Sequence, residues 1–186
     1  MKKTLFFLFF TFIVSASYSQ NSYKKIFKYG KYKDDWALVK SITGCYGIIN
    51  KNGQEIVPTI YAKIGKFTEC NGEYALVKCI TGNYGMINKN GQEIVPAIYA
   101  KIGKFTECNG EYALVKCITG NYGMINKKGQ EVVSPIYAKI GKFGEYADDI
   151  AVVKSITGNY GFINKDGKEI IATNYSFEEV KTKLKE

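Results

Sequence analysis

Cysteine has the widest chemical range of the residues in this chain, and four of its five copies recur at regular spacing. Eight residues separate Cys70 from Cys79, Cys108 and Cys117 repeat that spacing, and Cys45 stands apart. Zinc and iron–sulfur sites use closer pairs such as C-x₂-C, so this spacing argues against a metal centre. A disulfide inside one pair is also improbable, because about 25 Å of extended strand separates its members, whereas bonded Cα atoms lie within about 7 Å.

Two explanations for the cysteines therefore remain. They are small buried residues copied along with a repeated unit, or they form disulfides between neighbouring units, such as Cys79 with Cys117 and Cys70 with Cys108. Because the count is odd, at least one thiol stays free in a monomer.

Tyrosines and lysines recur in rows that are candidates for binding a polymer. These candidate residues are Tyr61, Tyr99, Tyr137, Lys63, Lys66, Lys101, Lys104, Lys139 and Lys142. An exposed tyrosine row stacks on sugar rings, whereas the alternative for the same residues is packing in the core. A lysine row attracts anionic polysaccharide or nucleic acid over long range, whereas the alternative is a solvated face shared with Glu69, Glu73, Glu107 and Glu111. Specific recognition of nucleic acid is not expected, because the chain has no arginine to read phosphates in bidentate fashion.

The charged residues exclude most familiar catalytic machinery. The 26 basic residues are all lysine, the 17 acidic residues leave a net charge of +9, and there is no histidine. Histidine-centred triads, imidazole–zinc sites and arginine fingers are thereby excluded. Asp148 and Asp149 are the acid pair outside the repeated pattern, but glycosidase-type chemistry needs two opposed carboxylates in a pocket. We expect no enzymatic activity, no cofactor and no metal.

Residues 1–19 have the pattern of a secretory signal peptide. Two lysines precede the apolar run from Leu5 to Val14, and Ser17 and Ser19 precede a cleavage site before Gln20. The apolar run is shorter than the roughly 20 residues of a membrane-spanning helix. We therefore expect export to the periplasm or the outside, without a transmembrane anchor.

A period of 38 residues organises the rest of the chain. The row Tyr23, Tyr61, Tyr99, Tyr137 and Tyr175 follows it without an insertion, and residues 46–81 differ from residues 84–119 at only two positions. A fixed period indicates stacked copies of one supersecondary unit. We divide the mature chain, 20–177, into a partial unit at 23–35 and full units at about 36–73, 74–111, 112–149 and 150–177, followed by a charged tail or short helix at 178–186.

Turn residues predict the strands within each unit. Asn90-Gly91 predicts a two-residue type I′ hairpin that pairs Met86 with Val95 and Ile87 with Ile94. A three-residue loop at residues 81–83, with Gly82 or Asn83 left-handed, precedes it, so Val77, Ile87 and Ile94 are expected to share one face.

Other residues predict where the third strand ends, how units are linked and how the chain terminates. Pro58 and Pro96 are expected to end the third strand, since proline lacks a backbone donor. The segment 98–105 is expected to be a linking strand. Ser176 and Glu179 form a capping-box pattern that predicts a short terminal helix.

The repeated residues resemble the WG-repeat family of bacterial β-repeat proteins over residues 23–177. The structural positions of that pattern are Tyr46, Gly47, Gly53, Phe67, Tyr84, Gly85, Gly91, Phe105, Tyr122, Gly123, Gly129, Phe143, Tyr160, Gly161 and Gly167. Tyrosine replaces the family's tryptophan, and Ala62, Ala100 and Ala138 replace a common acidic residue. The resemblance implies a non-enzymatic scaffold that is often exported.

We therefore predict an all-β protein of 38-residue antiparallel meanders, stacked in an open curved array, with a small propeller-like ring as the alternative. We expect a protein partner at the cell envelope; the alternatives are a glycan or anionic surface polymer on the Tyr and Lys rows, or a structural coat. The sequence does not indicate the oligomeric state.

Overall fold

The computed structural model describes residues 23–67, 72–105 and 110–186. The expected signal peptide, the cysteines Cys70 and Cys108, and the acids Glu69 and Glu107 lie outside the described residues.

The regular elements of the described part of the chain are all β-strands except one short helix at the C-terminal end. The elements are β1 (Tyr23–Ile26), β2 (Trp36–Ser41), β3 (Tyr46–Asn50), β4 (Glu55–Ile64), β5 (Tyr74–Cys79), β6 (Tyr84–Asn88), β7 (Glu93–Tyr99), β8 (Lys101–Ile102), β9 (Tyr112–Lys116), β10 (Tyr122–Asn126), β11 (Glu131–Ile140), β12 (Ile150–Ser155), β13 (Tyr160–Asn164), β14 (Glu169–Tyr175) and the helix α1 (Phe177–Lys183). The prediction of an all-β repeat fold is confirmed.

Within each sheet, every strand pairs antiparallel with the next strand in the chain, and β7 and β8 do not pair with each other. The strands form two seven-stranded sheets, β1 to β7 and β8 to β14, and only Ala100 separates β7 from β8. The long strand β4 pairs with β3 through Val57 and with β5 through Ile64, so it belongs to two units at once. The strand β11 has the same double role between β10 and β12.

Each unit therefore contains four strands, the three strands of the expected meander and the expected linking strand. Unit 1 consists of β1, β2, β3 and the first half of β4, and unit 2 begins with the second half of β4 and ends with β7. Unit 3 consists of β8, β9, β10 and the first half of β11, and unit 4 begins with the second half of β11 and ends with β14. The linking segment is the first strand of its unit and pairs with the second strand.

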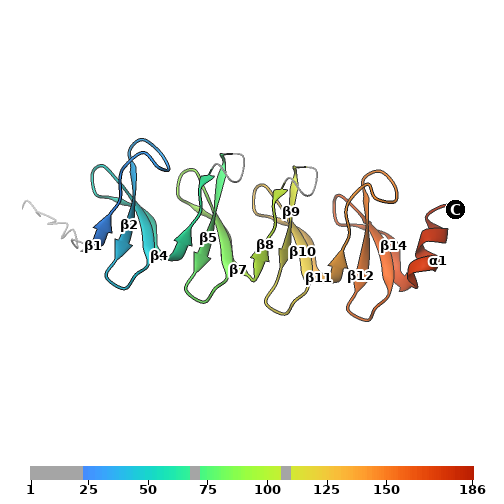
Figure 1. Ribbon diagram of the computed structural model, residues 1–186. Coiled ribbons are helices and arrows are strands. Elements are labelled where there is room, and N and C mark those ends of the chain that lie inside the picture. The colour runs from blue at the N-terminus through green and yellow to red at the C-terminus, as the bar shows by residue number, and fades with distance from the viewer. Residues whose placement is uncertain (1–22, 68–71, 106–109) are drawn as a thin grey trace, which may run out of the picture.

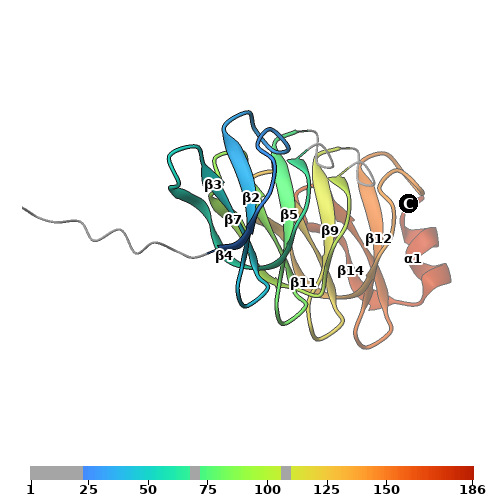
Figure 2. The same cartoon turned by 60° about the vertical axis from the view of Figure 1, so that its left-hand side comes forward.

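The units stand in an open row. They follow one another from β1 at one end to α1 at the other, and the two ends of the row lie far apart (Figure 1). The equivalent strands β2, β5, β9 and β12 succeed one another in the same order in the turned view (Figure 2). The open array is confirmed, and the ring is not formed.

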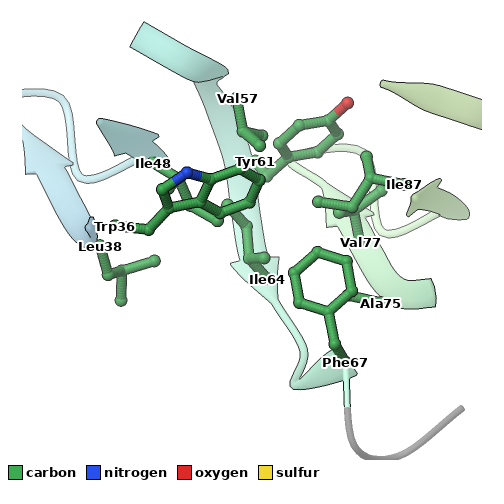
Figure 3. Packing of buried hydrophobic residues seen from close by; sticks show 10 residues of the cluster. All are labelled: Trp36, Leu38, Ile48, Val57, Tyr61, Ile64, Phe67, Ala75, Val77 and Ile87. Atoms are coloured by element: carbon green, nitrogen blue, oxygen red, sulfur yellow. The ribbon is translucent and has the colours of Figure 1, made fainter. Parts of the chain in front are cut away.

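The hydrophobic core is divided into layers between successive units. One cluster joins Leu38, Ile48 and Val57 of unit 1 to Val77 and Ile87 of unit 2, and Figure 3 shows these two groups on either side of Ile64. Equivalent clusters lie between units 2 and 3 and between units 3 and 4. Each sheet thus buries both faces, as expected for a stack in which neighbours cover each other.

The hairpin turn differs from the predicted type I′ geometry. The amide of Asn88 donates to the carbonyl of Gln92 at 2.8 Å, which closes a three-residue loop at 89–91, and within it Gly91 alone has a positive φ. The side chain of Asn88 holds this loop, because its Oδ1 accepts the amides of Asn90 and Gln92. The extra residue pairs Ile87 with Glu93 instead of Ile94, although Met86 pairs with Val95 as predicted. Consequently Ile94 packs in the next layer, not with Val77 and Ile87.

The preceding loop has the predicted odd length but begins one residue earlier. Cys79 and Asn83 close the loop, and Gly82 adopts the positive φ. Val77 therefore lies opposite Gly85, two residues from the predicted partner Ile87, and stays on the same face. Pro58 and Pro96 lie inside β4 and β7 rather than at their ends, within the stretch where the register shifts.

The two repeated glycines of each unit have separate packing reasons. A Cβ on Gly85 in β6 would lie 2.5 Å from the carbonyl oxygen of Val95 in β7, so only glycine allows β7 to approach this closely. Gly47, Gly123 and Gly161 meet the last strand of their own unit in the same way. A Cβ on the turn glycine Gly129 would lie 2.3 Å from the carbonyl oxygen of Ile94 in the previous unit, so this turn docks one unit on the next.

The predicted capping box and terminal helix are present. The amide of Glu179 donates to Ser176 Oγ at 3.3 Å, and the amide of Ser176 donates to Glu179 Oε2 at 2.8 Å. The helix buries Val180 against Ile150 and Phe162, so it covers the outer face of unit 4. In the described residues no helix is long and apolar enough to cross a membrane.

Candidate functional site

The tyrosine row proposed for glycan binding is buried. Tyr61, Tyr99 and Tyr137 are at most 4% exposed and pack in the layers between units. The expectation that they form an exposed row is wrong, and the alternative of core packing is confirmed. Their rings contribute to the core because the register places them where each long strand passes from one unit to the next.

Each of these tyrosines also makes a polar contact with the last strand of the following unit. The hydroxyl of Tyr61 donates to Glu93 at 3.3 Å, and Tyr99 and Tyr137 donate to Glu131 and Glu169 at 2.6 and 3.1 Å. Burial and the adjacent carboxylate both disfavour the phenolate, which raises the pKa of Tyr61 and of Tyr137 to about 12 and the pKa of Tyr99 further. The three hydroxyls are therefore protonated donors throughout the neutral range.

The predicted lysines are exposed, and three of them take part in an arrangement that the sequence did not reveal. Lys63 of β4 lies directly opposite Lys78 of β5. The same cross-strand lysine pairs occur once in each unit, as Lys25 with Lys40, Lys101 with Lys116 and Lys139 with Lys154. Directly opposite residues of an antiparallel pair lie on one face, where like charges destabilise the sheet. Lys66, Lys104 and Lys142 are exposed three residues further along the chain than Lys63, Lys101 and Lys139.

One lysine of every pair lies over an aromatic ring. The Nζ atom of Lys78 is 5.1 Å from the ring centre of Tyr84, the residue opposite it on β6. Lys40, Lys116 and Lys154 contact Tyr46, Tyr122 and Tyr160 at 5.1 to 5.3 Å. This contact with the ring's negative face holds the ammonium group in a fixed place without neutralising its charge.

The described acids bind other lysines. Glu73 pairs with Lys89 at 3.0 Å, Glu111 with Lys127 at 3.1 Å, and Asp149 with Lys165. None of the cross-strand lysine pairs forms an ion pair with a carboxylate of the described residues. In the described structure, the mixed-charge face therefore involves a different set of lysines from the one the sequence singled out.

Exposed isoleucines form a row that sequence reasoning missed. Ile42, Ile80, Ile118 and Ile156 occupy the loop between the second and third strands of each unit and are 70 to 73% exposed. Ile60, Ile98 and Ile136 lie on the last strand of units 1, 2 and 3 and are 53 to 58% exposed. The available signal was an isoleucine recurring inside the loop sequence I-T-G, a place where turns favour small and polar residues.

The two isoleucines of a unit lie together. In unit 1, Ile42 and Ile60 line one hollow of about 410 Å³ together with Pro58 and Thr59. In unit 2, the Sγ atom of Cys79 is 3.8 Å from the carbonyl oxygen of Ala97, which places the Ile80 loop beside the strand that carries Ile98. We call Ile42 with Ile60, Ile80 with Ile98, and Ile118 with Ile136 the isoleucine pairs.

The described cysteines are free thiols with a local structural role. Cys79 and Cys117 are not bonded to each other, so the predicted bridge between them is wrong. Each sulfur lies 2.8 Å from a threonine hydroxyl two residues later, Thr81 or Thr119, and this hydrogen bond lowers the thiol pKa. Ser41 and Ser155 make the same contact in the outer units.

The described residues contain no group of three or more ligand side chains that could hold a metal ion. The acid pair Asp148 and Asp149 is exposed, and Asp149 contacts Lys165.

Comparisons with known proteins identify a family. The sequence model of the WG containing repeat matches residues 46–79, 84–117, 122–155 and 160–177. A search of curated proteins finds no match. Among solved structures, BamB from Moraxella catarrhalis is similar with 14% identity and a TM-score of 0.33, over 82% of this chain and 52% of that chain. The C-terminal WD40 domain of Sif2 is similar with 9% identity and a TM-score of 0.34, over 80% of this chain and 46% of that chain. This chain thus spans about half the length of the solved chains it matches.

Proposed function

Given that this chain belongs to the WG containing repeat family, we propose that it is an exported, non-catalytic scaffold that binds a protein partner at the cell envelope. The observation that carries the proposal is the row of isoleucine pairs. We infer that the partner presents apolar side chains to this row.

The physical argument is the free energy of exposed apolar surface. Burying such surface in a contact is favourable by about 25 cal/mol per Å². Single exposed apolar residues are ordinary, whereas contiguous apolar patches mark interaction sites. Here Ile80 is 73% exposed and Ile98 is 53% exposed, and the exposure is nearly the same in each unit. A row that is regular in both position and exposure supports a contact surface.

Site-specific photocrosslinking tests this proposal. A benzoylphenylalanine at position 80 in the full chain, produced in its own cells, should crosslink one defined protein. The matched control carries the same photoreactive residue at position 90, an exposed loop tip at the other hairpin. Replacing Ile42, Ile118 and Ile156 with Asn should weaken crosslinking from position 80 without unfolding the chain, because exposed substitutions change stability by only about 0.5 kcal/mol. Equal crosslinking from positions 80 and 90 would contradict the proposal.

Export has its own test. Mass spectrometry of the protein recovered from cells should find an N-terminus at Gln20, and fractionation should place it outside the cytoplasm. A protein that retains Met1 in the cytoplasm would contradict export but not partner binding.

A second candidate function follows from the cross-strand lysine pairs. Four pairs of like charges that oppose each other within the sheet cost stability, and a polyanion lying along them would relieve that repulsion. We infer an anionic surface polysaccharide as the ligand. Retention on immobilised alginate should fall steeply with salt and should be reduced when Lys63, Lys101 and Lys139 are replaced by Gln.

The matched control replaces the ion-paired lysines Lys89, Lys127 and Lys165 by Gln, which removes the same number of charges. Equal loss of retention in the two variants would mean that only net charge matters, and this would overturn the role of the pairs.

A further inference from the structure

A hollow of about 1000 Å³ lies at the C-terminal end of the array. Its wall includes the lysine pair of unit 4, Lys139 and Lys154, together with Tyr160. Two further parts of the wall are the aromatic ring of Tyr146 and the aromatic ring of Phe177, which lies at the start of α1 and outside the repeat. In the sequence, the position of Tyr146 is a cysteine in the two preceding units.

The three aromatic rings form one cluster. The ring centres of Tyr160 and Phe177 are 5.1 Å apart, and those of Tyr146 and Phe177 are 6.1 Å apart in an edge-to-face arrangement. Tyr146 also meets the buried ring of Phe162 edge-on at 5.7 Å. The capping box at Ser176 fixes the start of α1 and hence the position of Phe177. These contacts make a firm wall even though Tyr146 itself is 37% exposed.

The charges around the hollow are mainly positive. Lys139, Lys142 and Lys154 line it, and Glu145 is the only acid among its lining residues. Lys154 is held with its Nζ atom 5.3 Å from the centre of the Tyr160 ring. Apolar surface from Ile140 and Val152 completes the lining.

We propose that this hollow binds a small amphipathic anion, with a flat apolar body and one carboxylate, phosphate or sulfonate group. The body lies against the aromatic cluster, because offset and edge-to-face contacts favour flat rings. The anionic group lies beside Lys154 and Lys139, where charge-assisted hydrogen bonds are available. The volume is at the upper end of the range of small-molecule sites. This site goes beyond the proposed function, since it needs neither the partner protein nor a polymer.

Fluorescence titration of the full chain with 8-anilinonaphthalene-1-sulfonate tests the site, because this probe has the required body and charge. We expect saturable binding of one probe per chain. N-phenyl-1-naphthylamine, which has the same body without the sulfonate, should bind about tenfold more weakly. Equal affinity for the two probes would overturn the requirement for an anion.

Matched variants locate the site. Lys154→Gln should weaken the anionic probe about tenfold and leave the neutral probe unchanged, whereas the control Lys78→Gln, at the equivalent place in unit 2, should change neither. Tyr146→Ala should weaken both probes. Because Tyr146 is partly exposed, we expect this variant to fold, and circular dichroism checks the folding directly. If Lys154→Gln and Lys78→Gln weaken the probe equally, or if Ile80→Asn removes the binding, the probe lies elsewhere and the proposal fails.

Discussion

At the residue scale, the contact between a buried tyrosine and an exposed glutamate links a strand that ends one unit to the last strand of the next unit. Tyr61, Tyr99 and Tyr137 donate to carboxylates at the start of β7, β11 and β14. The ring fills the core and the hydroxyl reaches the surface, so a single side chain serves packing and polar pairing.

These tyrosines predict a loss of stability at alkaline pH. Their pKa is raised in the folded state, to about 12 for Tyr61 and Tyr137, against an ordinary value of 10.0. A raised pKa favours the protonated folded form, so this contribution is fully present below about pH 10 and is lost as the pH rises through 12. Urea unfolding between pH 8 and pH 12 should show the decline. A variant with all three replaced by Phe should decline less over the same range, and parallel curves for the two proteins would contradict the assignment.

Removing the hydroxyl and removing the ring should have different effects. Tyr99→Phe loses one hydrogen bond to an exposed acid and should cost about 1 kcal/mol of unfolding free energy. Tyr99→Ala also leaves a cavity between units 2 and 3 and should cost about 3–5 kcal/mol. Denaturant titration of both variants at neutral pH measures the difference, and comparable losses would show that the ring adds little.

At the element scale, the hairpin turn between the third and fourth strands also serves as a docking point. Gly53 and Gly129 share the same left-handed conformation, but a Cβ on Gly53 meets nothing within 4 Å, whereas one on Gly129 meets the backbone of unit 2. The first unit has no preceding unit at this turn.

The two glycines therefore form a matched pair for mutation. Gly53→Ala should lower the free energy of unfolding by about 1–2 kcal/mol, because only the left-handed backbone conformation is unfavourable for alanine. Gly129→Ala should cost about 1–3 kcal/mol more, because the units must also separate. Thermal and denaturant unfolding measure both, and equal costs would mean that the turn does not dock the units.

The strands, turns and helix also show which features of the fold can be predicted from the sequence. The period, the hairpins, the capping box and the fold class follow from local signals, because glycine, asparagine and Ser-x-x-Glu act within a few residues of themselves. The turn type was missed because the side chain of Asn88, two residues before Asn90, holds a longer loop. The burial of Tyr99 and the exposure of Ile98 depend on which way the strand turns into the next unit, and no local pattern carries that information.

The candidate site was less predictable than the fold. Lys63 was singled out, but its opposition to Lys78 depends on the register after a bulge. The hollow at unit 4 depends on where α1 packs, which the capping box alone does not indicate.

At the scale of the whole molecule, the layered core predicts that a unit can be removed. Deleting residues 74–111 joins Glu73 to Tyr112, which reproduces the natural junction of Glu111 with Tyr112. The shortened chain should fold with one layer fewer and a lower unfolding free energy, because the stability of a stack is approximately a sum over units and their contacts. Circular dichroism and denaturant unfolding measure this. Complete loss of folded structure would point to a closed, all-or-none assembly instead.

The long strands shared between units have a mechanical consequence. Because β4 and β11 each enter two units without a break, these units are joined by paired strand instead of a flexible linker. The spacing between the isoleucine pairs of units 1 and 2, which share β4, is then as fixed as the sheet itself. A partner with two contact points at that spacing makes its second contact at a high effective concentration and gains avidity, whereas a partner with another spacing gains none. The array thus favours partners whose contact points are spaced by one 38-residue unit.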